Sequence, residues 1–306
     1  MPLGKPLSLH HRLSSHCIFP EIDGWTIVRG VWGGVVDRRL RAVWKDEFGS
    51  LVIEADGETC AAQAFFLTFA DVAQFDILFA SREIVARPFN EDISGHTIRH
   101  LLVDQIWPRV LAHNGALVLH ASGVATGEGA LLFVGHSGRG KSTLAASLHQ
   151  RGLPLIGDDA VLIDGLNDNA RCKAVYRSLR LFADSIETLF DPTVDQSDVA
   201  DYTDKRNIHF PVLETADASH PVRAIFFISP ESDDASARVN PVSPGDACMR
   251  LVEHNFWLDP TDMAKTTRKL HQASVLATRV PAWKLDYPRD FSKLDDLQAA
   301  IFSVLA

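Results

Sequence analysis

The chain has 306 residues, of which 46% are hydrophobic and 23% are charged, a composition typical of globular proteins. It has 30 lysines and arginines against 39 aspartates and glutamates, a formal net charge of −9. This balance argues against nucleic acid or an anionic membrane as the main partner, because both need a basic surface. No stretch reaches the ~18 apolar residues of a membrane span, and the start of the chain lacks the apolar core of a signal peptide. We therefore expect a cytoplasmic protein with no membrane partner.

The cysteines and the N-terminal histidines bear on redox state and metal binding. The four cysteines are far apart and form no CxxC pair, so we expect reduced thiols. They are Cys17, Cys60, Cys172 and Cys248. His10, His11 and His16 could form a metal-binding tract, but a frayed polar terminus is the favoured interpretation.

The first part of the chain is rich in short β-type runs separated by glycine and turn residues. These runs cover residues 24–28, 31–36, 51–54, 65–69 and 75–79. Such spacing predicts strands joined by tight turns. We expect a small β-rich N-terminal domain over residues 1–94, and no group of residues in it indicates chemistry.

A helix is predicted over residues 96–114, with apolar residues on one side and a kink or a new turn at Pro108. The order then becomes that of an α/β domain over residues 95–306. Strands are predicted at 117–121, 130–134, 155–157, 161–163, 223–228 and 283–287, and helices at 142–149, 245–256, 262–278 and near the C-terminus. Residues 187–221 have no regular pattern, and we expect a loop or a flap there.

One motif stands out between the predicted strand at 130–134 and the helix after it. The residues Gly135, His136, Ser137, Gly138, Arg139, Gly140, Lys141 and Ser142 match GxxxxGK[ST], and Thr143 follows. In a P-loop the backbone N–H groups surround phosphate oxygens, and the following helix directs its positive end at the same anion. Lys141 can reach the β- and γ-phosphates, and the Ser142 hydroxyl can bind Mg²⁺. We expect residues 135–143 to bind ATP.

Two adjacent acids end the next apolar run, at Asp158 and Asp159. An acid at the end of a strand in a P-loop protein holds Mg²⁺, directly or through water. Neighbouring side chains of an extended segment point to opposite sides, so one acid can face the metal and the other the nucleophile. The repulsion between them also raises one pKa, which favours a general base.

Other polar residues are weaker candidates. His120 lies in an apolar run before the P-loop strand, where a histidine is more often a core residue, although its ring could reach one of the two acids. Charge on a transferred phosphoryl group also requires cations. Arg177, Arg180, Lys205 and Arg206 are the candidates by position, and spacing does not rank them.

Together, residues 119–124, the P-loop, Arg151-Gly152 and Asp158-Asp159 resemble the catalytic domain of the HPr kinase/phosphorylase family. The resemblance covers about residues 95–180 well. It implies an α/β fold whose P-loop kinase core is of the HPr kinase C-terminal-domain type, with an ATP site related to that of phosphoenolpyruvate carboxykinase. It further implies that Asp158 is the general base on a serine hydroxyl, that Asp159 binds Mg²⁺ with Ser142, and that His120 assists Asp158. Lys141 would complete the catalytic set.

The chain also departs from that family. The bacterial sugar-transport kinases have Ser-Glu after the P-loop lysine, whereas this chain has Ser142-Thr143. Their N-terminal domain and arginine-rich C-terminal loop are not recognisable either. The chain is more similar to stand-alone HPr-kinase-like proteins of peptide natural-product clusters, which resemble kinases acting on the C-terminal serine of lasso-peptide precursors. The parent family forms oligomers, which leaves a homo-oligomer open.

The leading hypothesis is therefore an ATP- and Mg²⁺-dependent kinase for a serine hydroxyl of a peptide or small protein. A kinase for a small metabolite is an alternative, because its ATP site would look the same. A non-catalytic nucleotide-sensing module or a motor-type ATPase is the third hypothesis, although the chain lacks an LSGGQ-type signature.

Overall fold

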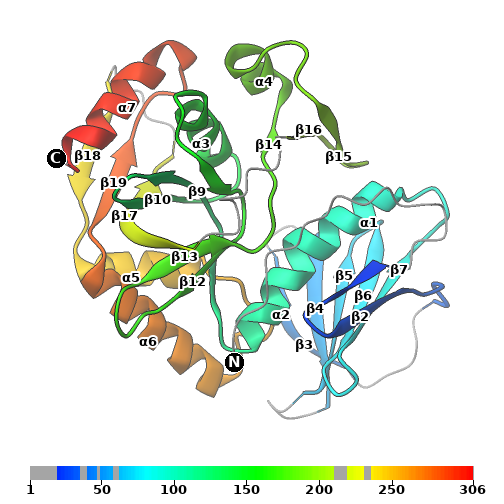
Figure 1. The fold of residues 1–306 in the computed structure, drawn as a ribbon. Helices are drawn as coiled ribbons and strands as arrows, with labels where there is room; N and C mark the ends of the chain where they lie inside the picture. Colours follow the sequence, from blue (N-terminus) through cyan, green and yellow to red (C-terminus); the bar gives the residue numbers. More distant parts are fainter. Residues whose placement is uncertain are drawn as a thin grey trace.

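The computed structural model describes residues 19–34, 40–46, 49–57, 62–209, 219–230 and 236–305. Within these ranges the fold is mixed α/β and contains three sheets (Figure 1). None of the helices in the described ranges has the length and hydrophobicity needed to span a bilayer. The expectations for His10, His11, His16, Cys17 and Cys60 fall outside these residues.

The strands of the N-terminal part form one seven-stranded sheet in the order β1-β2-β7-β6-β5-β4-β3. They are β1 Phe19–Ile22, β2 Trp25–Arg29, β3 Leu40–Lys45, β4 Leu51–Asp56, β5 Ala64–Phe69, β6 Ala73–Leu78 and β7 Glu83–Pro88. All neighbours are antiparallel except β2 and β7. In β4 every second side chain is buried, so the sheet has an apolar face.

That apolar face packs against a helix in three segments, namely α1 Gly95–Leu101, a π-helical turn Leu102–Ile106, and α2 Trp107–His113. Pro108 has no N–H to continue the α-helical ladder, and the N–H of Trp107 bonds to the carbonyl of Leu102, five residues back. The helix and the sheet share one hydrophobic cluster with Leu162 and Tyr176 of the following part. The domain boundary after residue 94 stays a prediction.

The second sheet has nine strands. They are β8 Leu117–Leu119, β9 Ala121–Thr126, β10 Gly129–Val134, β11 Leu155–Gly157, β12 Val161–Asp164, β13 Arg171–Ala174, β17 His220–Ile228, β18 Arg238–Pro241 and β19 Ala282–Asp286. The strands β10, β17 and β19 are parallel neighbours at its centre. Every residue of β10 is buried, as expected for a strand covered on both faces.

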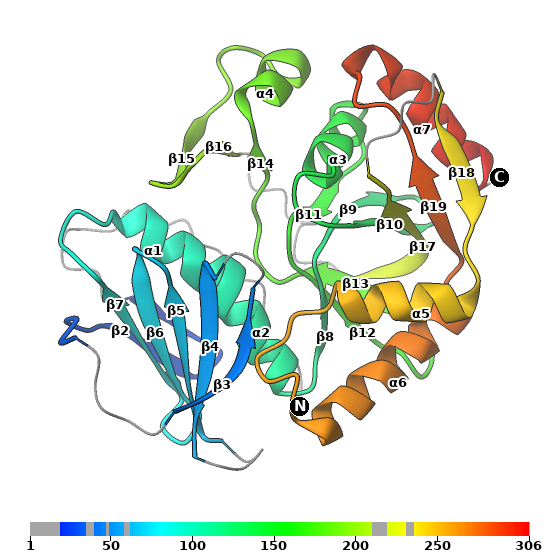
Figure 2. The same cartoon turned by 180° about the vertical axis from the view of Figure 1, so that it is seen from behind.

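Helices cover both faces of this sheet (Figure 2). One face holds Leu131 and Phe133 of β10 and packs against α3 Lys141–Gln150 and α7 Leu294–Ser303, which a 3₁₀ turn precedes. The other face packs against α5 Pro244–Glu253 and α6 Met263–Arg279. Of the cysteines that the structure describes, Cys172 and Cys248 are buried free thiols. The result is a three-layer α/β/α core with the segment 135–140 between β10 and α3.

The third sheet contains the strands β14 Arg180–Leu181, β16 Thr203–Ile208 and β15 Gln196–Ala200, with α4 Ala183–Leu189 beside it. The expectation of irregular chain over 187–221 is therefore wrong for β15 and β16. Most of their side chains are partly or fully exposed, so the pattern lacks the apolar alternation that reveals a strand. The carboxylate of Asp201, in the turn between them, accepts from the Ser94 N–H (2.9 Å) and the Thr97 hydroxyl (2.8 Å) at the start of α1.

Candidate active site

The segment 135–140 forms a tight loop between the end of β10 and the first residue of α3. Gly138 and Gly140 have φ values of +76° and +86°, a backbone region that favours glycine. A Cβ atom on Gly140 would also lie 2.8 Å from the hydroxyl of Tyr287. Helix α3 begins at Lys141, and among the described residues no side chain caps it. Its first N–H groups are therefore left for a ligand.

The ammonium group of Lys141 lies inside this loop, and only 4% of the residue is exposed. Its Nζ donates to the carbonyls of Gly135 (2.8 Å) and His136 (3.0 Å) and lies 3.1 Å from Nε2 of His120. Burial lowers the pKa of Lys141. The loop thus holds the cation at its centre.

The carboxylate of Asp158 is fully buried beside the P-loop. Its Oδ1 accepts from the hydroxyls of Ser142 (2.9 Å) and Ser122, and its Oδ2 accepts from the backbone N–H of Arg180 (3.1 Å). Burial, and then the neighbouring Asp159, raise the pKa of Asp158 to about 6. The acid that contacts Ser142 is therefore Asp158, whereas the resemblance paired Ser142 with Asp159.

The carboxylate of Asp159 points to a different set of partners. Its backbone is left-handed, with φ at +66°, which is uncommon for a residue other than glycine. Its Oδ2 accepts from a terminal nitrogen of Arg180, and its Oδ1 lies 3.6 Å from Nε2 of His120. Burial alone would raise the pKa of Asp159, but Arg180, together with His120 and Lys141, holds the pKa below its ordinary value. The structure therefore places His120 beside Asp159, where the resemblance implied Asp158.

His120 lies at the break between β8 and β9. Its N–H donates to the carbonyl of His254 (2.8 Å), which fixes the backbone. Its ring meets the Phe256 ring edge to face, with centroids 6.0 Å apart. Burial, and then the charge of Lys141, lower the pKa of His120 to about 4, so the ring is neutral near pH 7.

Arg180 is buried at the centre of a polar network and is 5% exposed. Besides Asp159, its guanidinium donates to Asp104 (2.5 Å), the Tyr176 hydroxyl (2.8 Å) and Nδ1 of His100 (2.7 Å). Asp104 and Tyr176 are not among the residues predicted from the sequence. One signal was available, because Asp104 falls three residues after Leu101, on the apolar side of the predicted helix.

The other three candidate cations separate by position. Lys205 lines two cavities next to this network, and so does Arg180. Arg206 pairs instead with Asp198 on the exposed side of the hairpin. Arg177 is not among the lining residues.

Two cavities meet at this network. The first has a volume of about 240 Å³ and contains the P-loop residues Ser137, Gly138, Gly140, Lys141, Ser142 and Thr143. Tyr287, Arg289 and Phe291 close its other side. The P-loop members Gly135, His136 and Arg139 are not among its lining residues.

The second cavity has a volume of about 760 Å³ and lies between the N-terminal sheet, α1 and the β15–β16 hairpin. Trp44, Phe69, His100, Arg109 and Tyr202 are among its lining residues. The residues common to both cavities are Ser137, Asp159, Arg180, Phe182 and Lys205. Asp158 lines neither.

Comparisons with known proteins were made for sequence and structure. No protein-family model and no curated protein matches the chain. Among solved structures it is similar to the Hpr(Ser) kinase/phosphatase from Coxiella burnetii, with a TM-score of 0.30 and 13% identity, over 61% of this chain and 88% of that chain.

Proposed function

We propose that this chain is a kinase that transfers the γ-phosphoryl group of ATP to a hydroxyl group of a peptide or small protein. The observation that carries the proposal is that Asp159 and Arg180 line both cavities. A group transfer needs two substrates to meet at one point, whereas a nucleotide sensor or a motor needs only the nucleotide site. The shared residues include an acid to orient the acceptor and cations to stabilise the transferred group.

The first cavity suits a nucleotide with Mg²⁺. The left-handed glycines and the uncapped start of α3 offer N–H groups to phosphate oxygens. The oxygens of Ser142 and Asp158 are adjacent, and Mg²⁺ prefers oxygen ligands. Ser142 lines this cavity and would hold the ion while its hydroxyl hydrogen is donated to Asp158, and the ion when bound offsets charge on the β- and γ-phosphates. Lys141 would exchange the loop carbonyls for phosphate oxygens.

The second cavity is the proposed acceptor site, and Asp159 is the group that the acceptor hydroxyl meets. Arg180 keeps the pKa of Asp159 low, so this carboxylate is ionised near pH 7 and can accept the hydroxyl hydrogen bond. Phosphoryl transfer has little need for a strong base, because its transition state is loose and positioning dominates. Arg180 orients Asp159 through its guanidinium, and the neutral His120 ring lies beside the other oxygen of this carboxylate. In this proposal Asp159 meets the acceptor hydroxyl and Asp158 belongs to the Mg²⁺ side, whereas the resemblance implied the opposite assignment.

The acceptor class rests on the larger cavity and on the resemblance. A cavity of about 760 Å³ lined by three separate parts of the chain has room for several residues of a peptide. The resemblance favours a serine hydroxyl as the acceptor. The most specific acceptor that it implies is the C-terminal serine of a lasso-peptide precursor. A small metabolite would occupy only part of this volume.

The test is transfer of labelled phosphate from ATP with Mg²⁺ to serine peptides, among them any precursor peptide encoded nearby, and to a panel of metabolites. We expect one added phosphate on a serine by mass spectrometry. Phosphorylation of a metabolite with no peptide product would contradict the acceptor class. Nucleotide binding with no acceptor-dependent ADP release would contradict a kinase.

A further inference from the structure

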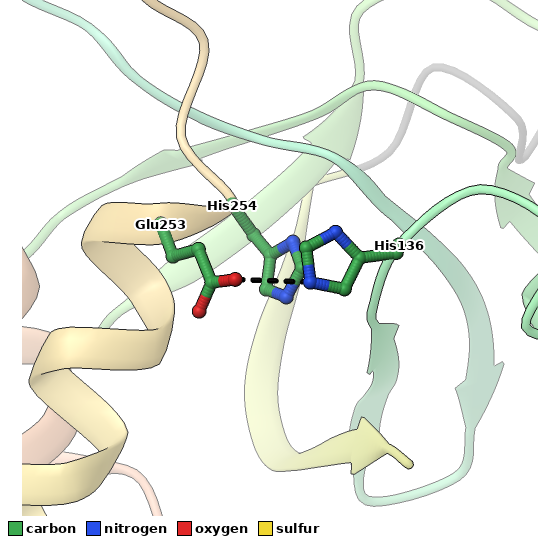
Figure 3. A group of neighbouring side chains, drawn as sticks. All are labelled: His136, Glu253 and His254. Atoms are coloured by element: carbon green, nitrogen blue, oxygen red, sulfur yellow. Dashed lines mark ion pairs between the residues drawn. The ribbon is translucent and has the colours of Figure 1, made fainter. Parts of the chain in front are cut away.

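A second cluster of titratable side chains lies at the outer side of the P-loop and takes no part in the proposed transfer. It comprises His136, Glu253 and His254 (Figure 3). His136 comes from the loop after β10, Glu253 is the last residue of α5, and His254 follows it. The His254 carbonyl accepts from the His120 N–H, which fixes this turn beside the loop.

The donor atoms of the three side chains converge. One ligand atom from each lies within 4.8 Å of the other two. Nε2 of His136 is 2.9 Å from Oε1 of Glu253, and the two imidazole rings meet edge to face with centroids 4.7 Å apart. Among the described residues, the ring nitrogens of His254 have no hydrogen-bond partner. The ring is therefore held toward His136 without a polar contact of its own.

We propose that His136, Glu253 and His254 bind one divalent transition metal ion, for which Zn²⁺ is the best match. Two imidazoles and one carboxylate are a ligand set found at zinc sites, with a further position for water. Mg²⁺ prefers oxygen ligands throughout, so the set also discriminates against the ion of the nucleotide site. Neutral imidazole is the form that binds metal.

The surroundings of the site are compatible with a cation. Glu253 supplies a negative charge, and both it and His254 lie at the C-terminal end of α5, where the helix dipole favours positive charge. Burial lowers the pKa of the His254 ring, and the charges of Lys141 and Arg250 also act on this ring and lower its pKa. The His136 carbonyl accepts from Lys141, so an ion on the His136 ring joins α5 to the loop that holds this lysine.

The experiment titrates the metal-free full-length protein with Co²⁺, followed by its visible absorption, and with Zn²⁺ by calorimetry. Neither nucleotide nor Mg²⁺ is present, so the result does not depend on kinase activity. We expect one ion per chain. Glu253→Gln and His254→Gln should each weaken binding roughly tenfold or more, because even changes around metal ligands cost ~10–100-fold. Glu253 is 54% exposed at its side chain, so its substitution should leave the fold intact, which circular dichroism checks.

Two control variants test whether the bound ion belongs to this cluster and not to other histidines of the chain. His271→Gln, on the exposed side of α6, should leave binding unchanged. A variant with His10, His11 and His16 all changed to glutamine should retain the one-ion site. Absence of binding to the unmodified protein, or binding that persists in Glu253→Gln and His254→Gln, would overturn the proposal and leave an ordinary histidine–glutamate ion pair.

Discussion

The guanidinium of Arg180 contacts the carboxylate of Asp159 at the point where the two cavities meet. The same guanidinium reaches Asp104 in the π-helical turn that precedes α2. One buried cation thus compensates two buried carboxylates that come from different parts of the chain. The orientation of Asp159 depends on this contact, and so does its ionisation.

Arg180→Met should destabilise the protein, because it leaves Asp104 and Asp159 buried without a counter-charge. Breaking such a buried pair typically costs about 3–5 kcal/mol. Urea unfolding followed by circular dichroism measures the loss. Arg180→Lys keeps the charge but not the forked geometry, so it should fold and lose most transfer activity.

Arg206→Lys is the matched control for these substitutions. Arg206 pairs with the exposed Asp198, and an exposed pair contributes about 0–1 kcal/mol. If Arg180→Met unfolds no more easily than Arg206→Lys, the network around Arg180 does not stabilise the fold as we infer.

Asp159→Asn should lower the rate of phosphoryl transfer on the order of 10²–10⁴-fold while nucleotide affinity is retained. Asparagine fits the left-handed backbone at this position, so the loss reports on the carboxylate and not on the turn. Single-turnover transfer and calorimetric ADP binding are the two measurements.

Asp158→Asn should act differently from Asp159→Asn. Asp158 accepts the hydroxyl hydrogen of Ser142, which lines the nucleotide cavity, so its substitution should weaken the Mg²⁺-dependent part of nucleotide binding. Comparison of ADP affinity with and without Mg²⁺ measures this. If Asp158→Asn abolishes transfer with unchanged Mg²⁺-ADP affinity, Asp158 is the acceptor-side acid, as the resemblance implied.

Lys141→Met should reduce ATP affinity by roughly 10–100-fold, because hydrogen bonds to charged groups contribute ~1.5–3 kcal/mol. Methionine fills a similar volume, so the fold should persist. Lys284→Met, on β19 outside the two cavities, is the matched control and should bind ATP normally. Equal affinity in the two variants would remove Lys141 from the nucleotide site.

The stability of the protein should fall as pH drops from about 6.5 toward 4. Burial lowers the pKa of His100, His113 and His120 to about 4 and that of His254 to about 3. In this window the unfolded chain binds protons that the folded chain does not, and each such proton costs ~1.4 kcal/mol per pH unit. The raised pKa of Asp158 works in the opposite direction between about 6 and 4 and offsets part of the loss. Urea midpoints at several pH values measure the slope.

His113→Gln tests, at a position away from the active site, whether buried histidines cause the loss of stability at low pH. The ring of His113 packs between Phe65 and Phe79 and lies 2.8 Å from the Lys265 ammonium. The variant should show a shallower decline of stability with falling pH, whereas His271→Gln should match the unmodified protein. Identical slopes for all three proteins would contradict the role of buried histidines.

Much of the α/β core was predictable from the sequence, because its elements have strong local signals. The apolar run 130–134 became β10, and the helix after the glycine-rich motif became α3. The hairpin β15–β16 was missed because its exposed side chains carry no alternation. Strand prediction depends on a buried face, and this hairpin buries little.

At the candidate site, the structure brings together the residues that the sequence singled out and adds their partners. Asp158, Asp159, His120 and Lys141 do lie together. Which acid meets Ser142 depends on the left-handed backbone of Asp159, and residue type gives no sign of it. The partnership with Asp104 was also hidden, because it joins residues 76 positions apart in the chain.

The π-helical turn at Leu102–Ile106 sets the helical phase at which Asp104 meets Arg180. A π turn holds one more residue than an α-helical turn of the same span. Removal of a single residue there would leave Pro108 in place, and each residue of an α-helix turns the side-chain direction by about 100°. A one-residue deletion in this turn would therefore direct Asp104 away from Arg180 while the rest of the helix remained intact, so the length of this segment is itself a determinant of the site.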